Sequence, residues 1–422
     1  MSTVSTAPTA AAVEAPVGPD AARALIAGGA LTDAPIGPVG LELERHVVDL
    51  ASPGALVTWR RLRAATAGLA LPGGSRLSFE PGGQVELSTS VAPGVLGAVE
   101  ALRADSAVLA GALGDDGLGL VGVGVDPARS PVRVSDGARY AAMAAYWSAV
   151  GQTGTGALMM CSTASLQLNL EAGPRAGWAD RITLVHALGP VLSAMAACSP
   201  LLGGVTTGWA SSRQRVWQEL DPARTAPFPG RGDPGGAWAS FALAAPLMML
   251  RRSGSVVGVT ERTTLLDWVG GARRPDERPP TGADVAQHLT TLWPPLRLRG
   301  FLELRMLDAV PMRWWPGLAA LVTTLLDDPR ASEVAAEVAD GAVGPVAGRW
   351  ADAARLGLAD PAIRAAVHRC TAAALPLVPA GLRTDATAYA ELLASGRTPG
   401  DLLRDSASEH GPLGCLLDGE LA

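Results

Sequence analysis

Four short segments of the chain alternate apolar residues with polar or charged ones at a period of two. They read GLELE at residues 40–44, EPGGQVELS at 80–88, SLQLNLE at 165–171 and FLELR at 301–305. Side chains two residues apart on a β-strand leave the same face, roughly 6.6 Å from each other. Each segment therefore predicts a strand with an apolar face against a core and a polar face opposite.

The polar positions of these strands carry side chains that bind ions. Because they are two residues apart, the members of each of these pairs should share the polar face of their strand: Glu42 and Glu44, Gln84 and Glu86, Gln167 and Asn169, and Glu303 and Arg305. If the strands share one sheet, its polar face gathers four or five carboxylates. Two unit charges about 4 Å apart repel by roughly 4 kcal/mol at an effective dielectric near 20, so such carboxylates favour a bound cation. Oxygen-only ligand sets suit Mg²⁺ or Mn²⁺. The alternative is that each segment is an ordinary solvent-facing strand of an antiparallel sheet.

Patterns along the rest of the chain favour an α+β fold. Strand-like patterns prevail over residues 39–134 and helix-like ones after residue 312. Helical apolar spacing predicts helices over 140–149, 183–197 and 351–374, and Pro- and Gly-rich composition predicts surface loops over 221–236 and 271–282. The uncharged run at 187–208 is interrupted by Gly and Pro, which favours a buried helix followed by a loop over a membrane span.

The same patterns suggest how the chain is organised. Residues 1–35 are rich in Ala, Pro and Thr, and the first cation is Arg23, so we expect a flexible N-terminal tail rather than a signal peptide. Residues 36–422 are expected to form a single catalytic domain, with a helical part from about residue 312. No internal repeat is visible.

Composition excludes several classes of protein. The 422 residues include 34 cations and 40 anions, a formal charge of −6, so no basic field for nucleic acid is expected. Every cation is Arg, and the absence of Lys excludes a Walker A loop and Schiff-base chemistry. The four cysteines form no CxxC pair, so neither a zinc site nor a disulfide framework is indicated, and we expect a reducing cytoplasm. A GxGxxG match at residues 117–122 continues as a strand instead of a helix, so it does not indicate a dinucleotide site.

Together, these motifs and their order resemble the glutamate-cysteine ligases. The likeness is to the branch shared by plant-type enzymes and the actinobacterial ligase of ergothioneine biosynthesis. Besides the four strands, the matching segments are Arg139-Tyr140 through Met159-Met160, Cys198-Ser199-Pro200, SSRQRVWQELDPART at 211–225 and FLELRMLD at 301–308. The resemblance covers about residues 36–311, and the C-terminal hundred or so residues match only as generic helices.

The resemblance implies a glutamine-synthetase-like fold, in which an antiparallel sheet forms a funnel for ATP, glutamate and divalent metal. In that family, the γ-carboxylate of glutamate attacks the γ-phosphate of ATP, and the amine of cysteine then displaces phosphate from the acyl phosphate. Residues that map onto the family's metal-binding positions are Glu42, Glu44, Glu86 and Glu303, with Glu80 as a further candidate. Gln167 stands where some branches have a metal-binding His.

Arginine should hold the anions that the metals do not, because its planar fork matches carboxylate and phosphate. Arg213 maps onto the family's arginine for the α-carboxylate of glutamate, and Arg305 is our choice for the transferring phosphate. Asn169 and Gln167 are expected to orient a substrate, with Arg215 and Trp217 accompanying Arg213.

Other functions remain open at this stage. Cysteine as the second substrate rests on the resemblance alone, so another γ-glutamyl amine ligase is an alternative. A catalytically silent regulator that binds metal or an amino acid could keep the same fold. A two-metal phosphohydrolase would need an Asp- and His-rich ligand set, which the motifs do not supply.

Overall fold

The computed structural model describes residues 15–228, 232–252, 254–341 and 346–418, and its largest sheet is entirely antiparallel. The strand order is β10-β11-β5-β1-β3-β2, and β4 pairs with the C-terminal half of β1. The strands of this sheet are β1 (Val39–Asp49), β2 (Arg76–Phe79), β3 (Val85–Ser88), β4 (Leu118–Val121), β5 (Ser165–Leu170), β10 (Leu296–Leu298) and β11 (Leu302–Asp308). Two small hairpins pair β6 (Leu201–Leu202) with β7 (Val205–Thr206), and β8 (Met249–Arg252) with β9 (Ser255–Gly258).

The register of the sheet confirms that the alternating strands share one polar face. Glu42 on β1 lies opposite Gln167 on β5, and Glu44 lies opposite Glu86 on β3. Asn169 on β5 lies opposite Glu303 on β11. The intervening leucines of these strands are almost fully buried on the other face. The predicted fold class, α+β with an antiparallel sheet, is therefore confirmed.

The second predicted strand is in fact a hairpin. Residues 80–84 turn the chain between β2 and β3, and the amide of Glu80 donates to the carbonyl of Gln84 at 2.8 Å. Pro81 has no N–H for a ladder, and Gly83 adopts φ +90°, a conformation that side-chain-bearing residues rarely adopt. Glu80 consequently projects from a turn instead of a strand.

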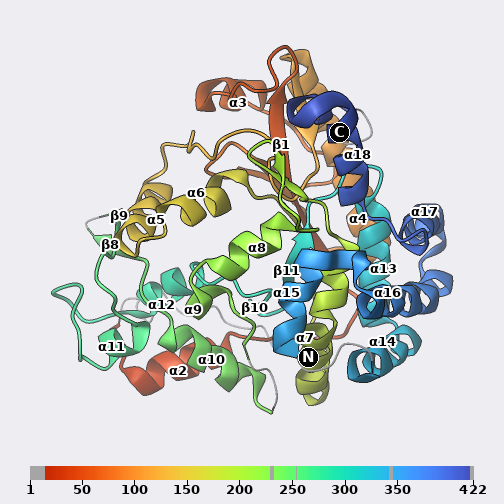
Figure 1. Ribbon diagram of the computed structural model, residues 1–422. Coiled ribbons are helices and arrows are strands. Elements are labelled where there is room, and N and C mark those ends of the chain that lie inside the picture. Colours follow the sequence, from red (N-terminus) through yellow and green to blue (C-terminus); the bar gives the residue numbers. More distant parts are fainter. Residues whose placement is uncertain (1–14, 229–231, 253, 342–345, 419–422) are drawn as a thin grey trace.

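Helices cover both faces of the sheet (Figure 1). They are α2 (Pro19–Gly28), α3 (Trp59–Ala65), α4 (Val95–Asp115), α5 (Ala138–Ala149), α6 (Thr153–Ser162), α7 (Trp178–Met195), α8 (Ser212–Glu219), α9 (Pro222–Thr225), α10 (Pro234–Ala244), α11 (Leu265–Val269), α12 (Gly282–Leu289), α13 (Trp315–Asp327), α14 (Pro329–Gly341), α15 (Val346–Leu356), α16 (Pro361–Ala374), α17 (Arg383–Ala394) and α18 (Pro399–Gly414). The apolar face packs on α4, α7 and α13.

Several predicted elements need correction. The helix α2 lies within the expected flexible tail, and it packs on α10 with Ala22 and Ile26 buried. The tail prediction is therefore wrong for this helix, while residues 1–14 lie outside the described residues. The 21-residue helix α4 stands in the region expected to be strand-rich. The predicted helix over 351–374 is two helices, α15 and α16, because Pro361 starts a new helix capped by Asp360.

Other predictions agree with the structure. The expected helix at 140–149 is α5, and the uncharged run enters α7 and continues into a loop that contains β6. Residues 272–281 form the expected loop, whereas the loop expected over 221–236 contains α9 and the start of α10. Among the described residues, no helix is both long and apolar enough to cross a bilayer. The proposed single catalytic domain stays a prediction.

Candidate active site

A cavity of about 610 Å³ opens on the polar face of the sheet. The sheet contributes the floor, and helices on both sides contribute the walls. Floor residues include Glu42, Glu44, Glu86, Gln167 and Arg305. Wall residues include Arg139, Tyr140 and Met143 from α5, Met159 and Met160 from α6, Arg213 and Trp217 from α8, Leu25 and Ile26 from α2, and Leu289 from α12.

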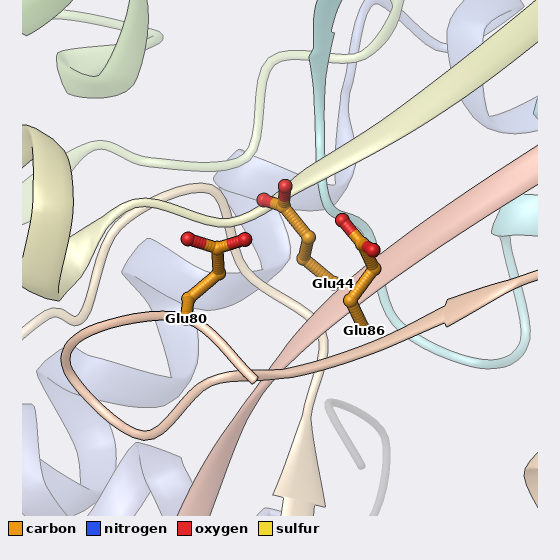
Figure 2. Close-up of side chains that lie close together, drawn as sticks. All are labelled: Glu44, Glu80 and Glu86. Atoms are coloured by element: carbon orange, nitrogen blue, oxygen red, sulfur yellow. The ribbon is translucent and has the colours of Figure 1, made fainter. Parts of the chain in front are cut away.

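Three carboxylates converge in this cavity (Figure 2). Glu44, Glu80 and Glu86 each offer an oxygen, and these oxygens lie within 4.8 Å of one another. Glu44 and Glu86 face each other across the β1–β3 ladder, while the turn before β3 carries Glu80. Three anionic oxygens at this separation fit a divalent cation such as Mg²⁺ or Mn²⁺.

The electrostatics of the three-carboxylate cluster also favour a cation. Burial and the neighbouring Glu86 raise the pKa of Glu44 to about 7. Burial, Glu44 and Glu86 raise the pKa of Glu80 to about 8. Glu44 already accepts hydrogen bonds from the Ser165 amide at 2.7 Å and from the Gln167 side chain at 3.1 Å. These donors do not offset the repulsion, so a positive ion here would stabilise the ionised carboxylates.

Glu303 lies in the opposite environment. It pairs directly with Arg297 across the β10–β11 ladder, and Arg297 Nη2 donates to it at 2.7 Å. Arg299 Nη1 donates to it at 3.0 Å, and Arg305 Nη1 lies 3.4 Å away. Burial alone would raise the pKa of Glu303, but the arginines outweigh it and lower the pKa to about 2. The predicted metal ligand is thus occupied by guanidinium groups and lies outside the three-carboxylate cluster.

Glu42 lines the cavity between these two environments. It accepts a hydrogen bond from Asn169 Nδ2 at 3.0 Å, and burial together with Glu303 and Glu86 raises its pKa. Gln167 links the two environments, because it donates to Glu44 and accepts from Arg305 Nη1 at 2.6 Å. Glu42 and Asn169 thus meet at the predicted face without joining the three-carboxylate cluster.

Arg213 and Trp217 both reach the cavity from α8. Arg213 is buried, and its Nη1 and Nη2 donate to the backbone carbonyls of Leu307 at 3.2 Å and Arg305 at 3.0 Å. Its guanidinium lies 6.0 Å from the ring of Trp217, one helical turn later. Two of the residues predicted around substrate on this helix therefore line the cavity.

The prediction for Arg215 is not supported by its position. Arg215 Nε pairs with Glu219 at 2.7 Å, its guanidinium lies over the ring of Trp209, and its side chain is 38% exposed. It does not line the cavity. The reason is helical geometry, because a residue two positions from Arg213 points to a different side of α8.

The sequence reasoning missed several cationic and aromatic residues of the cavity. Arg76, Arg297 and Arg299 were not named, and Arg139 and Tyr140 were named only in a matching segment, without a role at the site. One available signal was the RLR run at residues 297–299, which alternates with the same period as the FLELR strand that follows it. Arg297 lies in β10 and Arg299 directly follows this strand, and both are partners of Glu303.

Comparison with known proteins identifies the family of this chain. The sequence profile of Glutamate-cysteine ligase family 2 (GCS2) matches residues 38–418. The chain belongs to this family. It is 50% identical over 367 residues to "Glutamate--cysteine ligase EgtA" of Mycobacterium tuberculosis, covering 86% of this chain and 84% of that one. It is 30% identical over 263 residues to the chloroplastic glutamate–cysteine ligase of Medicago truncatula, covering 61% of this chain and 51% of that one.

A solved structure shows the same fold as this family member. The crystal structure of the glutamate–cysteine ligase of Francisella tularensis in complex with AMP superposes with a TM-score of 0.54 at 14% identity. The match covers 92% of this chain and 88% of that one. The predictions that the chain is a ligase of the glutamate–cysteine ligase family and has the fold of such ligases are confirmed.

Proposed function

We propose that this protein joins the γ-carboxylate of L-glutamate to the amine of L-cysteine and converts ATP to ADP and phosphate in doing so. Family membership and the 50% identity to the M. tuberculosis ligase support this reaction. The observation that carries the proposal is the three-carboxylate cluster, which shares one cavity with Arg213 and Arg305. Phosphoryl transfer needs such positioning and charge cancellation more than it needs a protein nucleophile.

The proposed cation site is the three-carboxylate cluster. Glu44, Glu80 and Glu86 would hold Mg²⁺ or Mn²⁺, and the bound ion supplies positive charge to the phosphates of ATP. Glu42 stays proposed as a further ligand, because it lines the same cavity and its pKa is raised. Glu303 also stays a proposed ligand, but its arginine partners would first have to release it.

The proposed chemistry has two displacements. A γ-carboxylate oxygen of glutamate attacks the γ-phosphorus of ATP, and ADP leaves. The cysteine amine then attacks the acyl carbon of the γ-glutamyl phosphate, loses a proton and expels phosphate. Arg305, held by Gln167, is proposed to neutralise the transferring phosphate. Cys161 has no role as a nucleophile here, because it is buried and burial raises the pKa of its thiol to about 11.

Arg213 is proposed to bind the α-carboxylate of glutamate. Its backbone contacts use one N–H of Nη1 and one of Nη2, and its Nε has no hydrogen-bond partner among the described residues. A guanidinium has five N–H groups, and Nη1 also lies 3.7 Å from Asp308 Oδ1, so the N–H of Nε and the second N–H of Nη2 are proposed to bind the anion. Lys cannot reproduce both the backbone contacts and a bidentate pair. Arg213→Lys should raise the glutamate KM by about tenfold and change the ATP KM much less. Equal rises in both constants would contradict this role.

The proposed product is γ-glutamylcysteine made in the cytoplasm, for ergothioneine biosynthesis. This assignment extends the sequence resemblance described above and the identity to the M. tuberculosis protein. A γ-glutamyl ligase for another amine would use the same cations and the same arginines. A silent regulator would have no need of three converging carboxylates beside two arginines.

One assay separates these functions. The purified protein is given Mg-ATP, with glutamate and cysteine added singly and together, and both ADP and γ-glutamylcysteine are measured. The proposal expects ADP and the dipeptide in a one-to-one ratio only when both amino acids are present. ADP formation with a different amine, and none with cysteine, would support the alternative ligase. Saturable glutamate binding without ADP formation with any amine would support the regulator.

A further inference from the structure

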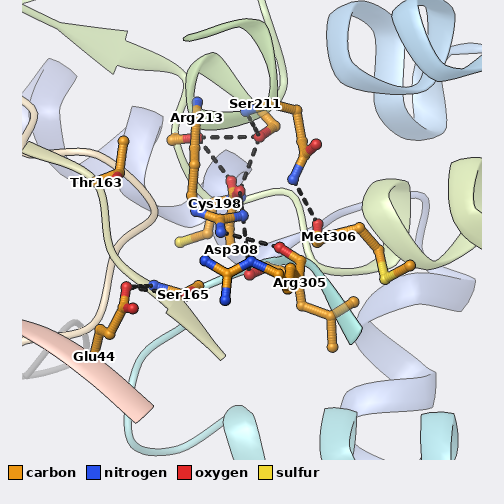
Figure 3. Close-up of polar contacts among 12 residues, drawn as sticks. Glu44, Thr163, Ser165, Cys198, Ser211, Arg213, Arg305, Met306 and Asp308 are labelled. Carbon is orange, nitrogen blue, oxygen red and sulfur yellow. Dashed lines mark hydrogen bonds and ion pairs between the residues drawn. The ribbon is translucent and has the colours of Figure 1, made fainter. Parts of the chain in front are cut away.

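A buried polar cluster lies behind Arg213 at the end of β11 (Figure 3). Asp308 Oδ2 accepts hydrogen bonds from the amide of Cys198 at 3.0 Å and from the hydroxyl of Ser199 at 2.7 Å. Asp308 Oδ1 accepts from the hydroxyl of Ser211 at 2.9 Å and lies 3.7 Å from Arg213 Nη1. Both carboxylate oxygens are therefore used, and the exposed fraction of the Asp308 side chain is only 1%.

The same cluster fixes the beginning of α8. Ser211 is the N-cap of α8, and its hydroxyl accepts from the amide of Gln214 at 3.0 Å. The hydroxyl of Ser199 accepts from the amide of Arg213 at 3.1 Å while it donates to Asp308. Rotation of either hydroxyl is thus set by Asp308, and the two hydroxyls set the position of the first turn of α8.

The irregular part of β11 provides the second set of contacts. Its register with β5 shifts between Leu304 and Leu307, which frees backbone carbonyls from the ladder. The carbonyls of Arg305 and Leu307 accept from Arg213, and the carbonyl of Met306 accepts from Gln214 Nε2 at 2.8 Å. The strand segment that carries Arg305 is therefore tied to the helix that carries Arg213.

We infer that Asp308, with Ser199 and Ser211, is the positioning residue that holds Arg213 for the α-carboxylate of glutamate. Asp308 does not line the cavity, so it acts through Arg213 and not on substrate. A buried guanidinium needs a counter-ion, and Asp308 is the carboxylate in ion-pair contact with Arg213 among the described residues. The inference rests on the proposed function, because it assumes the role of Arg213 in binding glutamate.

An amide cannot replace this carboxylate. Asn at position 308 would offer one acceptor oxygen where the two oxygens of Asp308 now accept three hydrogen bonds. Its NH₂ group would face either the Ser211 hydroxyl or the donors from residues 198 and 199. One N–H or O–H donor would be left without an acceptor, and Arg213 would lose its counter-ion. The first turn of α8 should then shift or loosen around Arg213.

The test compares Asp308→Asn with Asp105→Asn. Asp105 on α4 is a matched control, because it is fully buried and accepts from the backbone amides of Gly73 at 2.6 Å and Ser75 at 2.8 Å, away from the cavity. Asp308→Asn should raise the glutamate KM by about tenfold or more, and the ATP KM by less than about twofold. Asp105→Asn should lower the melting temperature and leave both KM values within about twofold of wild type.

A second variant covers the case in which Asp308→Asn does not fold. Ser199→Ala removes the acceptor for the Arg213 amide and one donor to Asp308, and should raise the glutamate KM selectively but less. Unchanged KM values, or equal rises for glutamate and ATP, in the folded Asp308→Asn protein would overturn the inference alone. If Asp308→Asn does not fold, unchanged KM values or equal rises for glutamate and ATP in Ser199→Ala would overturn the inference. A wild-type protein without glutamate-dependent turnover would overturn the proposed function and this inference together.

Discussion

The two ends of the polar sheet face carry the same residue type and opposite electrostatics. At one end, burial and mutual repulsion raise the pKa of Glu44 to about 7 and that of Glu80 to about 8. At the other end, three arginines lower the pKa of Glu303 to about 2. Glu44 and Glu303 lie on strands with the same alternation of residues, while Glu80 lies on the turn before β3.

The difference shows that the partners of a carboxylate, and not its place in an alternating strand, decide what it binds. In the three-carboxylate cluster, Glu86 pairs with the largely exposed Arg76 at 3.6 Å, but the pKa values of Glu44 and Glu80 stay raised, so the cluster fits a metal ion. Glu303 is already neutralised by Arg297, Arg299 and Arg305. An anion entering the cavity can draw on those arginines, so we interpret the Glu303 end as the phosphate side of the site.

The largest effect on activity should come from a substitution in the three-carboxylate cluster. Glu86→Gln keeps the shape of the side chain but removes a charged ligand from the cluster, so ligase turnover should fall by at least about 100-fold at ordinary Mg²⁺. Steady-state ADP release measures this. Glu100→Gln, on the exposed side of α4, is the matched control and should keep full turnover. A Glu86→Gln protein with normal turnover would remove the cluster from the mechanism.

The second prediction is that substitutions at the two ends of the polar face change the free energy of unfolding in different ways. Glu303→Gln leaves three arginines without their counter-ion and should lower the free energy of unfolding by about 3–5 kcal/mol. Glu44→Gln relieves repulsion and should leave the metal-free protein equally or more stable at pH 8. Urea denaturation of both variants without metal measures the contrast. Destabilisation of similar size in both would show that the two ends are not electrostatically distinct.

The pH dependence of stability should follow the titration of Glu44 and Glu80 in the three-carboxylate cluster. The pKa values of Glu44 and Glu80 are raised on folding, so the folded protein binds more protons than the unfolded chain above pH 4.5. The contribution of these two groups to the stability of the folded protein is present in full below pH 4.5 and is lost as the pH rises through about 7 to 8. The melting temperature of the metal-free protein should fall over this window. Mn²⁺ should raise it more at pH 8 than at pH 6, and an equal effect at both values would contradict the cluster as the metal site.

The smallest effect should come from Arg215, which lies on α8 but outside the cavity. Its pair with Glu219 is exposed, and such pairs contribute little to stability. Arg215→Ala should therefore change the glutamate KM and turnover by less than about twofold. A selective rise in the glutamate KM, comparable with that of Arg213→Lys, would restore the role that the sequence motif suggested.

The sequence by itself determined the strands β1, β5 and β11 and the face that most of their polar residues take. Alternation is a local property, since the backbone of a strand sends successive side chains to opposite faces whatever its neighbours are. The polar parity of Glu42 with Glu44 followed from it and held in the structure. Arg305 lies where the register of β11 shifts, but its Nη1 is still 3.4 Å from Glu303. The order of the motifs likewise sufficed to identify the family.

Only the tertiary structure decided which carboxylates meet. Glu80 reaches the three-carboxylate cluster because a hairpin turn carries it there. Glu303 forms an ion pair with an arginine that lies opposite it on the neighbouring strand. The helix α4 was also not predicted, because its Ala- and Gly-rich sequence gives weak periodicity and its stability comes from packing on β4, β1 and α13. Register and packing join residues far apart in the chain, so the side chain opposite a given carboxylate, and hence its charge and its ligand, is fixed only when the sheet is assembled.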